Sequence, residues 1–148
     1  MLQGVTRPLQ EVGLSVKRLQ MRHHRALDAE LAALDITLVQ WDALRHLDQN
    51  PDASLHDLAQ LTFQTDQSFG ALAGRLIDRG LIERVPGPGR AVHHRLTAKG
   101  RELRVAGGKV VEGVVARSFS GLTPDELETF DALLLRLLDP SEDRGGVG

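Results

Sequence analysis

Residues 64–75 combine short polar side chains, small side chains and an arginine in a pattern suited to contact with a nucleic acid. Gln67, Ala71 and Arg75 recur at intervals of four, so a helix would present them on one face. Small residues let a backbone approach base edges, and a glutamine amide can pair with an adenine edge through two hydrogen bonds. The residues of this segment expected to contact DNA are Gln64, Thr65, Gln67, Ser68, Ala71 and Arg75. The alternative is that Arg75 is an ordinary surface charge beside Arg79.

The positive charge of the chain is concentrated around this segment. Residues 62–104 contain eight Arg or Lys and four Asp or Glu, a net charge of +4, although the whole chain carries −2. The flanking stretches 1–61 and 105–148 are net acidic, at −2 and −4. A basic segment of this kind is typical of a polyanion-binding surface, because each neutralised phosphate releases counterions. An ordinary solvated surface is the alternative interpretation.

The sequence lacks the residues and motifs of several classes of enzyme and metal site. It contains no cysteine, which excludes disulfides, thiolate catalysis and cysteine-based zinc sites. It contains no nucleotide-binding glycine loop, no nucleophile elbow and no His-Glu-x-x-His motif. The neighbours His23 and His24 diverge on a helix, as His93 and His94 do on a strand, so neither pair readily shares a metal. We therefore expect no enzymatic activity, no metal and no cofactor.

Hydrophobic periodicity predicts the helices that would hold the 64–75 segment in place. A long helix over residues 7–33 precedes a second helix that Thr37 and Gln40 begin as a capping box. Two short helices follow, the first opened by Ser54 and the second running from Thr65 to about residue 79. The buried stripe predicted for the second short helix consists of Phe69, Leu72, Ala73 and Leu76.

A change of period after Gly80 predicts two short strands, 81–85 and 91–96, joined by the glycine- and proline-rich run 86–90 as a β-hairpin. Thr97 should begin a fifth helix, which three glycines within it weaken by up to about 1 kcal/mol each, so that it requires packing against another surface. Thr123 and Pro124 should begin a sixth. The order of elements over residues 37–97 is that of a winged helix-turn-helix. The expected fold is mainly α with a small β-hairpin wing.

The chain resembles the MarR family of bacterial transcriptional regulators from about Leu9 to Leu138. The resemblance rests on an ordered set of short segments and not on a single motif. These segments are Leu34-Asp35-Ile36-Thr37, Gln40-Trp41, Leu44, Leu58-Ala59, Arg75-Leu76, Arg79-Gly80-Leu81-Ile82-Glu83-Arg84, Arg90, Leu96-Thr97, Lys99-Gly100, Leu122-Thr123 and Glu126-Leu127. The resemblance implies a sequence-specific regulator that binds double-stranded DNA, and in particular a ligand-responsive repressor acting as a homodimer on a pseudo-palindromic operator.

The family fold also implies a helical dimerisation region in which the N-terminal helix and the last two helices of two chains intertwine. It implies a single domain over 1–148, with the winged helix-turn-helix at 37–100, dimerisation helices at 7–36 and 101–138, and a flexible tail at 139–148. The residues expected at the dimer interface are Leu9, Val12, Val16, Val114, Leu127, Phe130, Leu134 and Leu137. A monomer of this length could not easily cover the apolar stripe over residues 127–138.

The resemblance implies two further sites. The family places an arginine at the wing tip, two residues after an aspartate, to enter the minor groove; Arg90 matches the arginine, but Pro88 stands at the aspartate position. Family members commonly bind small, often anionic aromatic molecules between the dimerisation helices and the winged domain. The residues nearest to such an effector would be Arg22, His23, His24 and Trp41. Trp41 fits an ordinary core position equally well.

Other functions stay open from the sequence alone. The winged scaffold could serve as a small-molecule or metal-binding sensor, or as a protein–protein adaptor, without a DNA function. The sequence contains no apolar stretch of the length needed to cross a bilayer and no signal peptide at its N-terminus. We therefore expect a cytoplasmic protein that does not associate with membranes.

Overall fold

The computed structural model describes residues 7–86, 89 and 92–139. The chain divides into two compact units, Met1–Val114 and Val115–Gly148. Arg90 and Pro88 of the predicted wing lie outside the described residues, as does residue range 140–148 of the predicted flexible tail. The expected division into one domain with its subregions stays a prediction.

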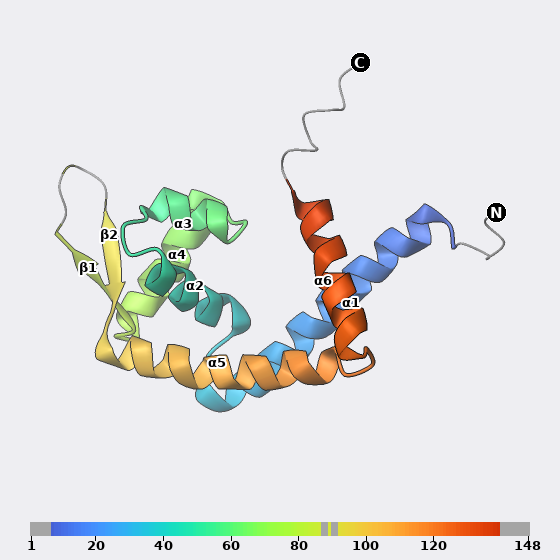
Figure 1. The fold of residues 1–148 in the computed structure, drawn as a ribbon. Coiled ribbons are helices and arrows are strands. Elements are labelled where there is room, and N and C mark those ends of the chain that lie inside the picture. Colours follow the sequence, from blue (N-terminus) through green and yellow to red (C-terminus); the bar gives the residue numbers. More distant parts are fainter. Residues whose placement is uncertain (1–6, 87–88, 90–91, 140–148) are drawn as a thin grey trace, which may run out of the picture. The chain divides into compact units, whose positions relative to one another are not determined.

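The helices and strands follow the predicted order (Figure 1). They are α1 (Leu9–Leu31), the 3-10 helix η1 (Ala32–Leu34), α2 (Leu38–Gln49), α3 (Leu55–Leu61), α4 (Asp66–Asp78), β1 (Ile82–Val85), β2 (His93–Leu96), α5 (Ala98–Ser118) and α6 (Pro124–Leu138). The expected mainly α fold with a small β-hairpin is confirmed. The first predicted helix ends at Leu31, because the chain then tightens into η1 and Asp35 adopts a left-handed conformation with φ of 56°.

Side-chain caps determine where the helices of the winged region begin. At α2 the hydroxyl of Thr37 accepts a hydrogen bond from the Gln40 N–H at 3.1 Å, and the Gln40 side chain accepts one from the Thr37 N–H. Ser54 and Asp57 form the same reciprocal pair at α3. The hydroxyl of Thr65 accepts a hydrogen bond from the Ser68 N–H at the start of α4. Each such cap stabilises its helix by about 1 kcal/mol, and the predicted caps at Thr37, Ser54 and Thr65 are confirmed.

The core of the first unit joins α1, α2, α3, α4 and the chain entering the hairpin. Its fully buried large side chains are Leu31, Leu44, Leu58, Leu76 and Leu81. Burial of one leucine side chain contributes about 1.5–3 kcal/mol. The predicted stripe of α4, which runs from Phe69 to Leu76, is buried and packs in this core. One face of α4 is therefore fixed in the fold.

The two strands form an antiparallel hairpin with one face on the core. Ile82 pairs with Leu96, and Arg84 pairs with His94. Ile82, His94 and Leu96 are buried, whereas the exposed Glu83 and Arg95 form an ion pair across the strands at 2.6 Å. The strands are shorter than predicted, since β1 begins one residue later and β2 two residues later. The hairpin is anchored at its base, close to the end of α4.

Glycines let α5 approach its neighbours in the first unit closely. A Cβ atom at Gly100 would collide with the backbone carbonyl of Leu81, and one at Gly107 would collide with the indole ring of Trp41. The indole Nε1 of Trp41 donates a hydrogen bond to the Arg104 carbonyl at 2.9 Å. The sequence predicts that this glycine-weakened helix needs a packing partner, and Trp41 is that partner at Gly107.

The second unit contains α6 and the residues that lead into it. Thr123 and Glu126 form a capping box, and Pro124 is the first helical residue, as predicted. The rings of Phe119 and Phe130 lie 6.0 Å apart at an angle of 58°. No residue of α6 is buried. None of the helices in the described part of the chain is both long and apolar enough to span a bilayer.

Candidate nucleic-acid interface

The face of α4 opposite the core carries the residues predicted to contact DNA. Gln67, Ala71 and Arg75 are exposed and lie one helical turn apart in succession. Ser68 and Thr65 are also exposed, near the N-terminal end of the helix. Gln64 is half-buried, and its Oε1 accepts a hydrogen bond from the Ser68 hydroxyl at 3.2 Å. The structure therefore brings the six residues of the predicted set together on one helix and its N-terminal turn.

Arg75 and Arg79 have different environments. Arg79 is half-buried and donates to the side chains of Gln40 at 3.2 Å and Asp35 at 3.5 Å. Its backbone carbonyl accepts a hydrogen bond from Lys99 Nζ, which caps the C-terminal end of α4. Among the described residues, Arg75 has no ion-pair partner and is exposed. Arg79 stabilises the position of α4, whereas Arg75 is available to a partner molecule.

The N-terminal turn of α4 carries a side-chain contact that was not predicted from the sequence. The Asp66 carboxylate lies 2.8 Å from Nδ1 of His56 on α3. Both side chains are exposed. A helix N-terminus favours anions, so the carboxylate of Asp66 stabilises α4 but also occupies the place where a phosphate would approach.

The turn between α3 and α4 places an aromatic ring in solvent. Phe63 is 98% exposed and has φ of 56°, a left-handed conformation. Bulky residues rarely adopt this conformation, and its cost is about 1–3 kcal/mol. From the sequence, Thr62-Phe63-Gln64 is predicted only to be a turn. No residue of this turn is glycine or asparagine, so the sequence carries no direct signal of a left-handed residue there.

A cleft of about 470 Å³ lies between α3, α4 and the hairpin. It is lined by Ser54, Leu55, His56, Gly70, Ala73, Gly74, Ile77, Arg84, Val92 and His94. Burial lowers the pKa of His94, and the nearby positive charges of Arg84 and His93 lower it further. His94 is therefore neutral at pH 7, and Arg84 is the permanent cation of the cleft. An apolar lining with one permanent cation suits a small anion that carries a ring.

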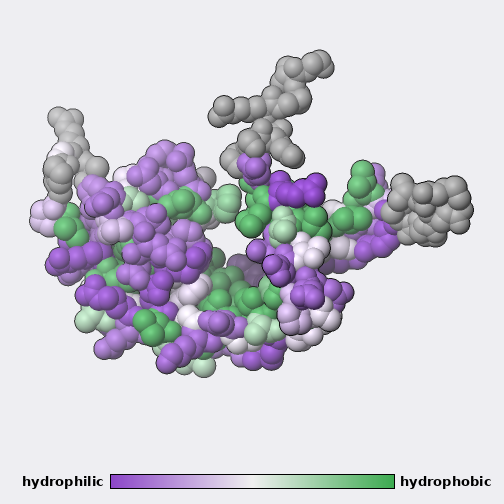
Figure 2. Space-filling model, viewed as in Figure 1, coloured by the Kyte–Doolittle hydropathy of each residue, from purple (hydrophilic) through white to green (hydrophobic). Residues whose placement is uncertain are grey.

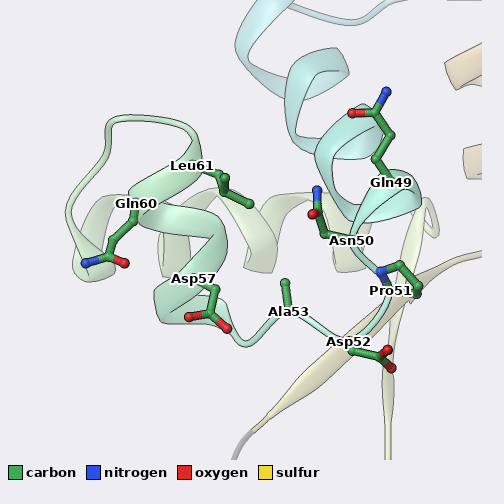
Figure 3. Close-up of a pocket in the computed structure, with 8 residues that line it drawn as sticks. All are labelled: Gln49, Asn50, Pro51, Asp52, Ala53, Asp57, Gln60 and Leu61. Atoms are coloured by element: carbon green, nitrogen blue, oxygen red, sulfur yellow. The ribbon is translucent and has the colours of Figure 1, made fainter. Parts of the chain in front are cut away.

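A second cleft, of about 650 Å³, lies between the end of α2 and α3 (Figure 3). Its lining includes the carboxylates of Asp52 and Asp57 and the amides of Gln49, Asn50 and Gln60. Hydrogen bonds from the backbone and hydroxyl of Ser54 lower the pKa of Asp57, which keeps this carboxylate ionised. None of the described residues that line the cleft has a basic side chain. Its negative charge disfavours a nucleic acid or another anion.

The predicted effector residues occupy different environments on α1 and α2. Arg22 is exposed, His23 is half-buried, and His24 lies 3.1 Å from the Asp28 carboxylate. Trp41 is only 7% exposed and packs in the core, in agreement with the alternative core position predicted for it. Their role in binding an effector stays a prediction. Within the described ranges, no three His, Asp or Glu side chains are grouped so that they could hold a metal ion.

Most of the predicted interface residues on the terminal helices are uncovered in a single chain. On α1, Leu9, Val12 and Val16 are 88%, 46% and 62% exposed. On α6, Leu127 and Leu137 are 38% and 83% exposed, and Phe130 and Leu134 are half-buried. Figure 2 shows hydrophobic side chains at the surface of these helices. Val114 differs, because it is buried within its own chain.

Comparison with known sequences shows what this arrangement resembles. A model of the MarR family matches residues 34–91. The chain is 32% identical over 113 residues to the HTH-type transcriptional repressor Rv2887 of Mycobacterium tuberculosis, a match that covers 75% of this chain and 81% of the relative. It is 23% identical over 119 residues to the HTH-type transcriptional repressor IacR of Pseudomonas putida, covering 79% and 71% of the two chains.

Solved structures show the same fold. The structure of Rv2887 has been solved in complex with salicylic acid. It matches with a TM-score of 0.73 and 30% identity, and the match covers 90% of this chain and 98% of that chain. Rv2887 has also been solved in complex with DNA. That structure matches with a TM-score of 0.73 and 29% identity, and the match covers 89% of this chain and 98% of that chain. A mutant of Escherichia coli MarR complexed with operator DNA is similar in fold, with a TM-score of 0.80 at 23% identity over 90% of this chain and 100% of that one. The winged helix-turn-helix and the identity to Rv2887 together show that the chain belongs to the MarR family of transcriptional regulators.

Proposed function

We propose that this protein is a sequence-specific, ligand-responsive transcriptional repressor that binds duplex DNA as a homodimer. The observation that carries the proposal is the two-sided character of α4, which buries Phe69, Leu72 and Leu76 and exposes Gln67, Ala71 and Arg75. A helix held on one side and polar on the other can enter a major groove about 12 Å wide. The similarity to Rv2887, which was solved with DNA, supports the same conclusion.

In the proposed complex, α4 of each chain lies in a major groove. The side chains of Gln67 and Arg75 contact base edges, and the N-terminal amides of α4 near Thr65 approach a phosphate. Two copies related by a twofold axis would read half-sites whose centres are about 10 base pairs apart. Arg90, which lies outside the described residues, would contact the minor groove from the wing. This role requires no catalytic step. We place the protein in the cytoplasm, where the DNA that it would bind is located.

The test is a binding titration with duplexes that the protein itself selects from a random-sequence library. We expect one sequence class to be enriched, and its affinity to fall steeply between about 50 and 200 mM salt. Arg75→Ala should weaken binding by about 1–3 kcal/mol if the guanidinium contacts a base. Arg18→Ala, which removes another exposed positive charge, on α1, serves as the control. No enrichment, or an equal effect of the two substitutions, would contradict the proposal.

We also propose that the effector is a small aromatic anion. Salicylic acid was bound in the structure of Rv2887, and the cleft between α3, α4 and the hairpin combines Arg84 with apolar Leu55, Ile77 and Val92. A ligand there would contact the back of α4 and could change its fit to DNA. Titration with salicylate should release DNA from the wild-type protein. Arg84→Ala should abolish this response if the effector occupies the cleft, and Arg22→Ala should abolish it if the predicted α1–α2 site is used.

A further inference from the structure

We propose that Phe63 reads DNA sequence, and that its ring packs against the methyl group of a thymine at the edge of the major groove. This inference rests on the proposed function and adds to it a contact that the polar face of α4 does not supply. Phe63 is 98% exposed, although phenylalanine is among the side chains most often buried. Its exposure is therefore not explained by packing within the chain.

The backbone around Phe63 forms a motif that favours glycine. The N–H of Gln64 donates to the Ala59 carbonyl at 2.8 Å, and the N–H of Phe63 donates to the Gln60 carbonyl at 3.2 Å. This pair of bonds defines a Schellman motif, in which the residue at the position of Phe63 is usually glycine because it must be left-handed. The same pair of bonds ends α4, where Leu81 and Gly80 donate to Leu76 and Ile77.

The two motifs differ in what occupies the left-handed position. At the end of α4 it is Gly80, with φ of 70°, and no strain results. At the end of α3 it is Phe63, so the chain keeps a strained aromatic residue where glycine would fold more easily. Residues held in such conformations cluster at binding sites, where the surrounding structure supports them. This contrast indicates that the ring of Phe63 is retained for a contact outside the chain.

The position of Phe63 favours DNA as the partner. It stands two residues before Thr65, the cap of α4, and is continuous with the exposed first turn that carries Gln67 and Ser68. In a docked helix-turn-helix, the second helix enters the major groove N-terminus first, and the first helix crosses the backbone. The turn that joins them, here α3 to α4, therefore lies over the edge of the groove.

The chemistry of the ring identifies the feature it would recognise. A phenyl ring has no hydrogen-bond donor or acceptor and cannot pair with a phosphate or a polar base edge. The one apolar group in the major groove is the C5-methyl of thymine, which distinguishes T·A from the other base pairs. Burying one methyl group against the ring should change affinity about fourfold. Phe63 would thus specify thymine at one position in each half-site.

The test replaces thymines of a selected duplex one at a time with deoxyuridine, which lacks only the methyl group. For the wild-type protein, one position in each half-site should bind about fourfold more weakly after replacement. For the Phe63→Gly variant, replacing the thymine at that position should no longer change the affinity. Replacements at the other positions should have the same effect as in the wild-type protein. Phe63→Leu should retain part of the discrimination, because leucine still offers an apolar contact. Leu61→Ala, a nearby change in an exposed apolar side chain that lines the cleft of Figure 3, should leave the pattern unchanged.

Thermal unfolding of the same variants provides a second measurement. Phe63→Gly should unfold at a higher temperature than the wild type, since glycine removes the strain at φ of 56°. A gain in stability combined with a position-specific loss of thymine discrimination supports the proposal. It is overturned if Phe63→Gly keeps the wild-type deoxyuridine pattern or weakens binding equally at every position. If the wild-type protein enriches no duplex at all, the proposed function fails together with this inference.

Discussion

The Asp66 carboxylate has two opposite effects, because it stabilises helix α4 and disfavours the binding of DNA. It stabilises α4 from the first turn through the helix dipole, and it lies where a DNA phosphate would approach in the proposed complex. The partner at Nδ1 of His56, 2.8 Å away, was not predictable, because the two residues are ten apart in the sequence and on different helices.

Asp66→Asn should therefore strengthen DNA binding while weakening the fold slightly. The expected gain in affinity is about 1.4-fold to fivefold at low salt, since exposed charge interactions are worth about 0.2–1 kcal/mol. Binding titrations at several salt concentrations would measure it, and the gain should shrink as salt screens the charge. Asp52→Asn is the control, because Asp52 is an exposed carboxylate in the cleft beyond α2. Equal gains for both variants would show that only net charge matters.

His94, in strand β2 of the hairpin, makes the folding stability of the protein depend on pH. Burial lowers its pKa below the ordinary value of 6.5, so in the pH range below 6.5 the unfolded chain binds more protons at this residue than the folded chain. The contribution of His94 to the free energy of unfolding is therefore fully present above pH 6.5 and decreases as the pH falls below that value. The pKa values of Asp57 and Glu126 are lowered from 3.8 and 4.5, so their contributions are lost only at more acidic pH.

We expect the urea midpoint of the wild-type protein to fall between pH 7.5 and pH 5.5 by more than that of His94→Gln. The slope with pH is the quantity to compare, because the substitution itself changes a buried side chain and shifts the midpoint at every pH. The variant keeps the Asp57 and Glu126 carboxylates, so the difference in slope isolates His94. Parallel curves for the two proteins would contradict the assignment of this pH dependence to His94.

At the level of elements, local signals predicted most of the fold. The capping residues Thr37, Ser54, Thr65 and Thr123 marked the helix starts, because a cap is read from a few neighbouring residues. Gly80 marked the end of α4 for the same reason. The face of α4 that is exposed also followed from its apolar spacing.

Contacts between distant elements were not predictable from one sequence. The indole of Trp41 packs on Gly107 and donates to Arg104, residues more than sixty positions away. Spacing could place Trp41 on a buried face but could not identify what covers it. Arg84 and His94 likewise reach the cleft beside α4 through the register of the hairpin, which the sequence leaves open. The left-handed conformation of Phe63 was not predictable, because it depends on the backbone hydrogen bonds of the turn and the sequence has no glycine there.

The contact between Trp41 and α5 can be tested by adding one methyl group. Gly107→Ala should destabilise the fold by about 1–3 kcal/mol, because the new Cβ would lie 2.7 Å from Nε1 and overlap the ring. Gly108→Ala is a matched control, since its Cβ would meet Trp41 at 3.9 Å, an ordinary contact. The control should instead gain up to about 1 kcal/mol from helix propensity.

Fluorescence is a direct readout of this pair of variants, because Trp41 is the only tryptophan in the chain. The Gly107→Ala protein should show a shifted emission maximum in the native state, as the ring moves away from its hydrogen bond to Arg104. Urea titration gives the two changes in unfolding free energy. Stabilisation by both alanines would mean that helix propensity dominates and that the ring adapts at little cost.

At the scale of the whole molecule, charge and apolar surface are segregated along the chain. The segment of residues 62–104 is net positive, whereas both flanking stretches are net negative. A polyanion is therefore attracted to one region and repelled by the others, which orients the protein on approach. The flanks instead carry exposed apolar side chains on α1 and α6, which need a protein partner to be covered.

Leu137→Glu should convert the proposed homodimer into monomers. Leu137 is 83% exposed in a single chain, so a carboxylate there removes little packing within that chain but would be buried at an interface between two copies. Light scattering should show half the wild-type mass, and affinity for a two-half-site duplex should fall because the half-sites are no longer bound by linked subunits. Ala132→Glu adds the same charge to the opposite face of α6, where it should leave both properties unchanged. A dimer that persists in Leu137→Glu, or a wild-type protein that is monomeric, would mean that the apolar face of α6 is not the dimer interface.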